Sequence, residues 1–197
     1  MRALSIIFAL AVFFSSALAL GVLTEVVNEG FEGGSIPTGW QNWVLGVSDV
    51  PWYISSGSPH TGTYHAQHDW SWSGPCDDWL VTETYDLTYF NDLSYSFWHS
   101  GYDASYYTYT GFWISDVEDP DDSDFVELVE LGAPPTGYQE VTGDISAYIG
   151  EEFVTFAWVY QGYFGHGHYI DDILIQGDAP LATIQPTSLG HIKTLMK

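Results

Sequence analysis

The chain has 197 residues and a formal net charge of −23, because 26 acidic residues face only 3 lysine and arginine residues. Those three are Arg2, Lys193 and Lys197, so no Lys or Arg stands between residues 3 and 192. Such a chain repels polyanions, which argues against nucleic acid and anionic membranes as partners. Adaptation to a saline habitat would explain the acidity equally well. The single cysteine, Cys76, excludes an internal disulfide.

The first 20 residues have the pattern of a secretory signal peptide. Arg2 supplies the charged start, residues 6–14 the apolar run, and Ala17-Leu18-Ala19 a small-x-small cleavage sequence. A membrane anchor is the alternative, but the apolar run is shorter than the roughly 20 residues that a span needs. We therefore expect an exported bacterial protein, secreted or held at the cell surface, because a disulfide-free domain fits bacterial export.

From residue 21 to residue 177 the sequence indicates short strands separated by turn-forming residues, without sustained helical periodicity. The expected strands are, in chain order, residues 22–28, 40–47, 64–72, 78–83, 93–100, 106–115, 125–131, 138–145, 153–160 and 169–176. Roughly ten short strands of this kind predict a single all-β domain, a jelly-roll β-sandwich.

Two of these strands indicate their place in a sheet. Leu93, Tyr95 and Phe97 alternate with serines, which predicts one buried face. The segment FVTFAWVY, residues 153–160, has apolar residues at both its odd and its even positions, which predicts a central strand covered on both faces. Residues 178–197 contain a Pro-containing linker and a short tail, read either as a frayed terminus or as a sorting or anchoring signal.

Four stretches carry a resemblance to a known family. They are EGFEGGSIPTGW (29–40), CDDWLVTETYDL (76–87), the segment from LSYSFW to FVELVEL (93–131), and the segment that ends in IDDILI (138–175). In this order and spacing they resemble the cleaved adhesin family of gingipain-type adhesin modules, which are similar to MAM-type jelly rolls. The resemblance covers nearly the whole body of the chain and implies a β-sandwich module for adhesion or binding.

The resemblance also implies a structural calcium ion that ties the first strand to the last. By that analogy the ligands would be Glu29, Glu32, Asp78 and Asp171, with Asp77 and Asp172 as replacements for their neighbours. Asp171 stands in an apolar terminal strand, where burying a carboxylate is costly unless it is compensated. Because no Lys or Arg is available, a divalent cation held by oxygen ligands is the expected compensation. The alternative is that these acids lie at strand ends in water.

The acidic run VEDPDDSDF, residues 117–125, is a second place to look for a cation. It lacks the glycine and the terminal glutamate of an EF-hand loop. Pro120 and the Asp and Ser residues favour turns. We therefore expect a solvated loop between two strands, with calcium binding as the lesser alternative.

Catalytic patterns are weak. Paired acids occur almost everywhere in so acidic a chain, and no Gly-x-Ser-x-Gly elbow is present. The seven histidines show no spacing that makes three or four zinc ligands converge. Cys76 precedes two acids, and acidic neighbours favour the neutral thiol over the reactive thiolate, so we do not expect an activated cysteine. We expect the protein not to be an enzyme.

Aromatic residues make up 17% of the chain, more than one core requires, with concentrations in HDWSW and YDASYYTYTGFW. Either Tyr107, Tyr109 and Trp113 or the alternate positions of that strand face outward. We take these three as candidate ligand-binding residues, because exposed aromatic rings provide stacking platforms for sugars. A second covered face or a contact between copies is the alternative.

These observations together predict a secreted binding or adhesion module, stabilised by calcium, that recognises an extracellular glycan or protein. The alternative is a structural protein that assembles with itself in a surface layer.

Overall fold

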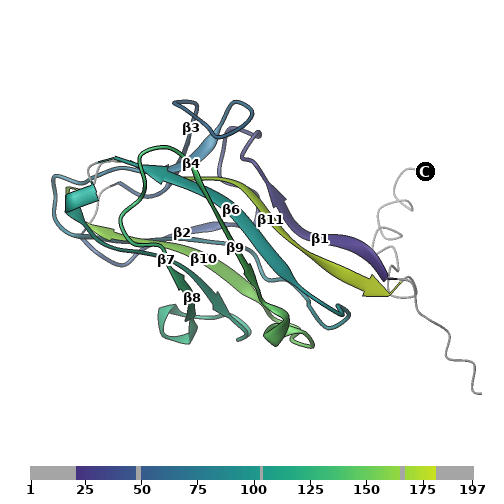
Figure 1. Cartoon of the computed structure of the whole chain (residues 1–197). Coiled ribbons are helices and arrows are strands. Elements are labelled where there is room, and N and C mark those ends of the chain that lie inside the picture. Colours follow the sequence, from purple (N-terminus) through teal and green to yellow (C-terminus); the bar gives the residue numbers. More distant parts are fainter. Residues whose placement is uncertain (1–20, 48–49, 103, 165–166, 181–197) are drawn as a thin grey trace, which may run out of the picture.

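The computed structural model describes residues 21–47, 50–102, 104–164 and 167–180. These residues form two antiparallel β-sheets packed face to face, which confirms the expected all-β sandwich (Figure 1). The expected signal peptide and the tail from residue 181 lie outside the described residues. Within the described ranges, no helix has the length and apolar character needed to cross a membrane.

Within the described residues, eleven strands make up the two sheets. The six-stranded sheet has the order β3-β4-β11-β6-β9, and β1 also pairs with β11. Its strands are β1 (Gly21–Glu29), β3 (Tyr53–Ser55), β4 (His65–His68), β6 (Ser94–Gly101), β9 (Gln139–Asp144) and β11 (His168–Pro180). The five-stranded sheet has the order β2-β5-β10-β7-β8. Its strands are β2 (Gln41–Val44), β5 (Cys76–Val81), β7 (Tyr107–Ser115), β8 (Val126–Glu130) and β10 (Thr155–Gly162).

Short 3-10 helices lie in three of the connections: η1 (Ala104–Tyr106), η2 (Asp122–Asp124) and η3 (Ser146–Tyr148). Each of the ten expected strands has a counterpart within a few residues. Strand β3 was not expected, because its few residues are too short to show an alternating pattern. Strand β11 continues to Pro180, past the boundary expected at Gly177, because β1 pairs with it to the end, Gly21 opposite Pro180.

Strand β10 is the centre of the five-stranded sheet and is buried on both faces, as the sequence predicts. Phe156 and Trp158 point between the sheets into the main core. Ala157 and Val159 point to the other side, into a second apolar cluster on the outer face of the same sheet. The aromatic surplus is therefore divided between a core and a partly covered outer face.

Strand β11 changes its neighbour halfway along one edge. On that edge it pairs with β4 through residues 168–170 and with β1 through residues 173–180. Its register with β6, on the other edge, shifts between Asp171 and Leu174, which marks a β-bulge. The pair Asp171-Asp172 therefore lies where neither β4 nor β1 provides a partner strand.

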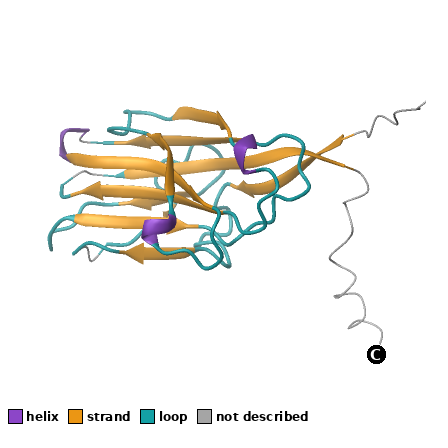
Figure 2. Cartoon of the chain, turned by 90° about the horizontal axis from the view of Figure 1, so that it is seen from below, coloured by secondary structure: helices purple, strands orange, loops and turns teal. Residues whose placement is uncertain are grey.

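The two ends of the sandwich differ. At one end β4 leads to β5, β6 leads to β7, and β10 leads to β11, and we call this the aromatic end. At the opposite end the paired termini of β1 and β11 project beyond the sheets, as Figures 1 and 2 show. A partner that approaches the aromatic end therefore does not meet the chain termini of the described domain.

Replacement of Trp158 by alanine tests the core. Its indole is fully buried, stacks on Phe112 at 4.8 Å and Trp40 at 5.7 Å, and meets Phe97 edge-on at 5.7 Å. We expect Trp158→Ala to lower the free energy of unfolding by about 3–5 kcal/mol, since it leaves a cavity. Urea unfolding measures the change from the midpoint and slope. The matched change at the exposed Trp72 should stay within about 0.5 kcal/mol, and an equal loss in both would contradict the assignment of the core.

Candidate binding surface and metal ligands

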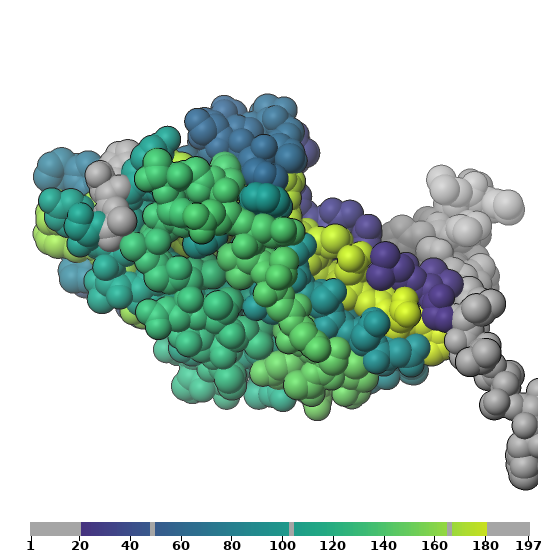
Figure 3. Space-filling model, in the orientation of Figure 1, coloured from purple at the N-terminus to yellow at the C-terminus, as the bar shows by residue number. Residues whose placement is uncertain are grey.

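The acids of β11 are covered by the segment before β4. The carboxylate of Asp171 is buried, and its Oδ2 accepts hydrogen bonds from the backbone N–H groups of His60 at 2.7 Å and Thr61 at 3.3 Å. These bonds use the gap left between β4 and β1. In Figure 3 the covering segment, in blue, stands at the top of the molecule above the yellow of β11.

Asp172 and Glu32 hold the same segment. Asp172 contacts His60 Nδ1 through Oδ2 at 2.6 Å and accepts from the Thr61 hydroxyl through Oδ1 at 2.7 Å. Glu32 Oε1 accepts from the N–H groups of Thr63 and Tyr64 at 2.8 and 3.0 Å. Backbone amides and one imidazole therefore surround three carboxylates.

Gly62 is required in this segment for two reasons. Its φ of +62° lies in the left-handed region, and a Cβ there would stand 2.3 Å from Glu32 Oε1. The ring of His60 is also fixed, because it stacks on Trp98 at 3.9 Å. The sequence thus specifies how closely the segment approaches the acids.

The environment shifts the pKa values of Asp171 and Glu32 in opposite directions. Burial raises the pKa of Asp171 to about 6, although the amides of Asp172, His60 and Thr61 act in the other direction. The backbone hydrogen bonds from Thr63 and Tyr64 lower the pKa of Glu32. Asp171 is therefore the acid for which an additional cation would have the largest effect.

The four residues expected as calcium ligands separate into three places. Glu32 and Asp171 are brought to one segment, and Asp172, considered as a replacement, joins them. Glu29 accepts a hydrogen bond from the N–H of Phe31, and its charge acts on Tyr85. The structure gives it no direct contact with the segment around His60 among the described residues.

Asp78 lies apart from Glu29 and from the pair Glu32 and Asp171. It points between the sheets from β5, where its Oδ2 lies 2.8 Å from Nε2 of the buried His68. Asp171 lies instead under the segment that covers the outer side of β11. The expectation that Asp78 joins Asp171 does not match this geometry, because strand parity directs Asp78 and the core residue Leu80 to the same side.

The candidate ligand residues of β7 also separate. Tyr109 and Trp113 share the outer face of the five-stranded sheet, where the indole N–H of Trp113 donates to the Tyr109 hydroxyl at 2.6 Å. That hydroxyl donates to Glu127 at 2.5 Å. Both rings are partly buried against the apolar cluster to which Trp79 and Phe125 belong, and the Trp79 ring lies 5.4 Å from that of Trp113. The alternative of a second covered face therefore describes this surface better than an open platform does.

Tyr107 faces the interior, contrary to the shared face expected for it with Tyr109 and Trp113. Its ring meets Tyr160 edge-on at 5.5 Å and packs against the main core. The cause is a register shift opposite Gln161 and Gly162, which reverses the parity of β7 between Tyr107 and Tyr109.

The most exposed aromatic ring of the described residues, that of Trp72, lies at the aromatic end. Trp72 is 78% exposed and contacts Trp70 with ring centroids 4.2 Å apart. Phe164 packs against both indoles and against Tyr106. Tyr106 is 55% exposed and Tyr163 is 41% exposed. We call these five rings, Trp70, Trp72, Tyr106, Tyr163 and Phe164, the aromatic cluster. The sequence shows its residues as HDWSW and as a surplus of rings but does not reveal that the three segments meet.

The acidic run of residues 117–125 forms a solvated loop, as expected. Asp121 caps η2, and its Oδ1 accepts from the N–H of Ser123 at 2.9 Å. Asp124 in turn accepts from the N–H of Asp121 at 2.9 Å. Each of these carboxylates satisfies the backbone of its own loop.

Replacement of Asp171 by asparagine should change how stability depends on pH. In the native state the raised pKa keeps a proton on Asp171 up to about pH 6, whereas the unfolded chain loses it near its ordinary value. The free energy of unfolding of the wild type should therefore fall, relative to Asp171→Asn, between about pH 4 and pH 6 and then remain level. Chemical unfolding in chelator at several pH values measures this difference. The same comparison with the exposed Asp122→Asn should be flat, and a flat result for Asp171→Asn would contradict the prediction.

Comparison with known proteins gives structural matches without sequence matches. No protein-family model and no curated protein matches the chain. The K3 cleaved adhesin domain of Lys-gingipain from Porphyromonas gingivalis superposes with a TM-score of 0.63 at 20% identity, covering 77% of this chain and 98% of that one. The K1 domain of the same protein superposes with a TM-score of 0.62 at 18% identity, covering 80% of this chain and 99% of that domain. TmCBM61, solved in complex with β-1,4-galactotriose, superposes with a TM-score of 0.52 at 18% identity, covering 74% of this chain and 92% of that one. The chain thus has the fold of the cleaved adhesin domains, as the resemblance in sequence predicts.

Proposed function

We propose that the protein is an exported, non-catalytic module that binds an uncharged glycan through the aromatic cluster. The observation that carries this proposal is the exposure of Trp72. Exposed apolar surface of this kind on a soluble domain marks an interaction site, and aromatic rings dominate such sites. Nearby Trp70 and Phe164 hold the Trp72 side chain, so binding would order few further rotatable bonds.

The charge of the chain restricts the ligand. Recognition of sugar carboxylates or sulfates uses Arg or Lys, and residues 3–192 contain neither. Asp69 stands directly before Trp70 and accepts a hydrogen bond from the Tyr53 hydroxyl at 2.5 Å. A neutral sugar can stack on the rings and donate its hydroxyl protons to such acceptors. Anionic polysaccharides would instead be repelled.

The solved structures support the same class of function. The similar folds include the cleaved adhesin domains, the galactotriose complex of TmCBM61 and a xylan-binding module of Paenibacillus barcinonensis. One of the two carbohydrate-binding modules is solved with β-1,4-galactotriose, and the other is described as a xylan-binding domain. This likeness supports a binding module, while the choice of surface rests on the aromatic cluster of this chain.

Replacement of Trp72 by alanine tests the surface. On an array of neutral and acidic glycans we expect the wild type to bind neutral chains and Trp72→Ala to lose at least about tenfold in affinity, since central aromatic contacts contribute 1–2 kcal/mol or more. Calorimetry on the best glycan measures the loss. Tyr89→Ala is the matched control, because Tyr89 is 58% exposed outside the cluster.

Trp113→Ala separates the two aromatic surfaces. A loss only in Trp113→Ala would move the site to the outer face of the five-stranded sheet. Binding to acidic glycans alone, or to matrix proteins with no glycan bound, would overturn the proposal. Light scattering addresses self-assembly: oligomers that disappear in Trp72→Ala, without any glycan binding, would support the structural alternative.

We further propose that calcium stabilises the module at Glu32, Asp171 and Asp172. The donor set consists of oxygen atoms, which suits Ca²⁺. A buried Asp171 with a raised pKa, beside a second carboxylate and with no Lys or Arg, supports a need for positive charge. The ion would join the segment after β1, which carries Glu32, to β11. To bind it, the carboxylates would have to release part of the hydrogen bonds that they accept from the amides of residues 60–64.

Removal of calcium should lower the melting temperature. An ion bound only to the native state adds about 2.7 kcal/mol when its concentration is one hundred times its Kd. We expect chelation to lower the melting temperature of the wild type, and excess Ca²⁺ to restore it. Asp171→Asn should respond much less, whereas Asp122→Asn should respond as the wild type does. A melting temperature that neither chelator nor Ca²⁺ changes would refute the site.

A further inference from the structure

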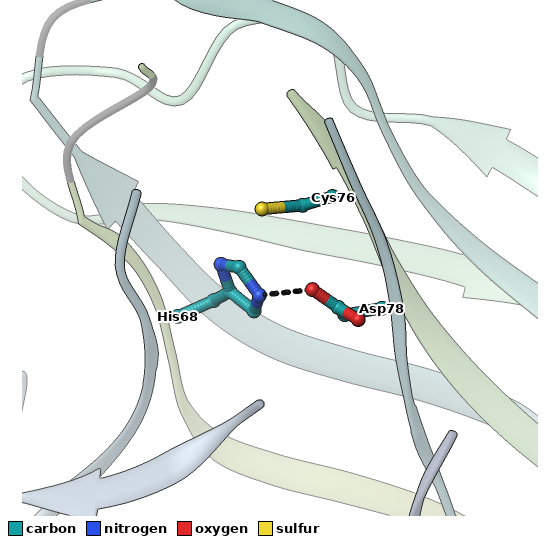
Figure 4. Close-up of side chains that lie close together, drawn as sticks. All are labelled: His68, Cys76 and Asp78. Atoms are coloured by element: carbon teal, nitrogen blue, oxygen red, sulfur yellow. Dashed lines mark hydrogen bonds and ion pairs between the residues drawn. The ribbon is translucent and has the colours of Figure 1, made fainter. Parts of the chain in front are cut away.

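Three side chains that could bind a metal converge inside the aromatic end. His68 points inward from β4, and Cys76 and Asp78 point toward it from β5 on the facing sheet (Figure 4). One ligand atom of each lies within 4.8 Å of the other two, and all three residues are buried. His68 Nε2 and Asp78 Oδ2 are 2.8 Å apart. The three come from both sheets, so an ion here would join the two layers.

This cluster has unused donors and acceptors. Asp78 Oδ1 and His68 Nδ1 are buried and form no hydrogen bond with the described residues. Buried polar atoms are normally satisfied, and a buried one without a partner costs about 1–3 kcal/mol. Such atoms at a convergence of three ligand types indicate a missing partner rather than a core that is complete as it stands.

The surroundings hold the three ligands in place. The indole N–H of Trp52 donates to the backbone carbonyl of Asp78 at 3.1 Å, and its ring packs against His68 at 5.5 Å. The ring of Tyr160 also stacks on His68, with centroids 4.0 Å apart. Rigid apolar surroundings of this kind fix ligand orientation and exclude water from a metal site.

We propose that His68, Cys76 and Asp78 form a structural zinc site that is separate from the calcium site. Thiolate and imidazole ligands select zinc among abundant divalent ions, whereas calcium prefers oxygen. Ligand atoms around a tetrahedral Zn²⁺ are about 3.3 to 3.5 Å apart, so small side-chain movements convert the observed cluster to this geometry. On binding, the Cys76 thiol would give its proton to solvent, and the His68 imidazole would coordinate through one ring nitrogen and keep its proton on the other. The thiolate and the Asp78 carboxylate would then balance the two positive charges of the ion.

A fourth donor stands beside the cluster. His168 on β11 is the register partner of His68 on β4 and is fully buried. Both of its ring nitrogens are without a hydrogen bond among the described residues. Its ring packs against Trp52 at 5.4 Å, the same indole that contacts His68. His168 does not belong to the group of three whose ligand atoms converge, so it would have to move toward them to become the fourth ligand of a closed structural site.

The site would also control the proposed glycan surface. His68 and Cys76 flank residues 69–75, which carry Trp70 and Trp72. A zinc ion bound to both flanks would fix the base of this segment and limit the movement of the exposed indoles. This consequence depends on the proposed function, but the zinc site itself does not.

Metal loading during refolding tests the site, because a buried site fills as the chain folds. The full protein is unfolded with reductant, refolded with or without Zn²⁺ in the presence of Ca²⁺, and dialysed. We expect about one zinc per chain and a higher melting temperature than without zinc. With Co²⁺ as the probe we expect a thiolate-to-cobalt charge-transfer absorption. Changes in outer-shell residues already cost about 10–100-fold in affinity, so Cys76→Ser and Asp78→Asn should lose at least that much.

The neighbouring Asp77→Asn is the matched control, since Asp77 accepts from the Trp79 indole on the outer face of the sheet. It should retain both zinc and the cobalt spectrum. Equal zinc content in the wild type and Cys76→Ser, or a cobalt spectrum without the thiolate band, would overturn the proposal. If a variant fails to fold, the wild-type spectrum alone still decides whether the thiolate is a ligand.

Glycan affinity measured on the zinc-loaded and zinc-free protein then tests the link to the aromatic cluster, and equal affinities would remove this link but leave the zinc site intact.

Discussion

The constraint on which the structure depends is that a carboxylate in this domain has no lysine or arginine with which to pair. Among the residues that the structure describes, Asp78 and Asp171 are nevertheless fully buried, and each carboxylate has a different kind of partner. Asp171 accepts backbone N–H groups from a segment laid across a gap in the sheet. Asp78 faces a histidine between the sheets. Backbone amides and imidazoles therefore take the place that guanidinium groups occupy in ordinary proteins, and they explain why histidine and tight loops concentrate around the buried acids.

Irregularities in two strands decide the functional geometry. The bulge in β11 at Asp171 directs two adjacent acids toward the segment that begins at His60. The register shift opposite Gly162 places Tyr107 inside while Tyr109 remains outside. Each bulge adds a residue without disturbing the apolar alternation on either side of it. Both positions lie next to proposed sites, as bulges often do.

The fold could be predicted from the sequence because alternation and turn residues are local signals. Leu93, Tyr95 and Phe97 show a buried face, and residues 153–160 show a strand covered on both sides. The sites depend on non-local information. Nothing near Asp78 in the sequence reveals that its strand faces His68, and nothing near Trp72 reveals that Phe164 lies beside it. The family resemblance grouped Asp78 with Asp171 by analogy, but strand parity separates them.

The pairing of Gly21 with Pro180 determines how the domain carries tension. Hydrogen bonds between antiparallel strands lie perpendicular to the strands. Pulling these two residues away from each other would break the hydrogen bonds between β1 and β11 one after another, starting at the chain ends of the described domain. Force applied between Pro180 and a partner held at the aromatic end would instead run along β11, whose bonds to β6 and β1 would share the load in shear. A domain anchored at Pro180 alone would therefore resist unfolding under a load applied at its aromatic end.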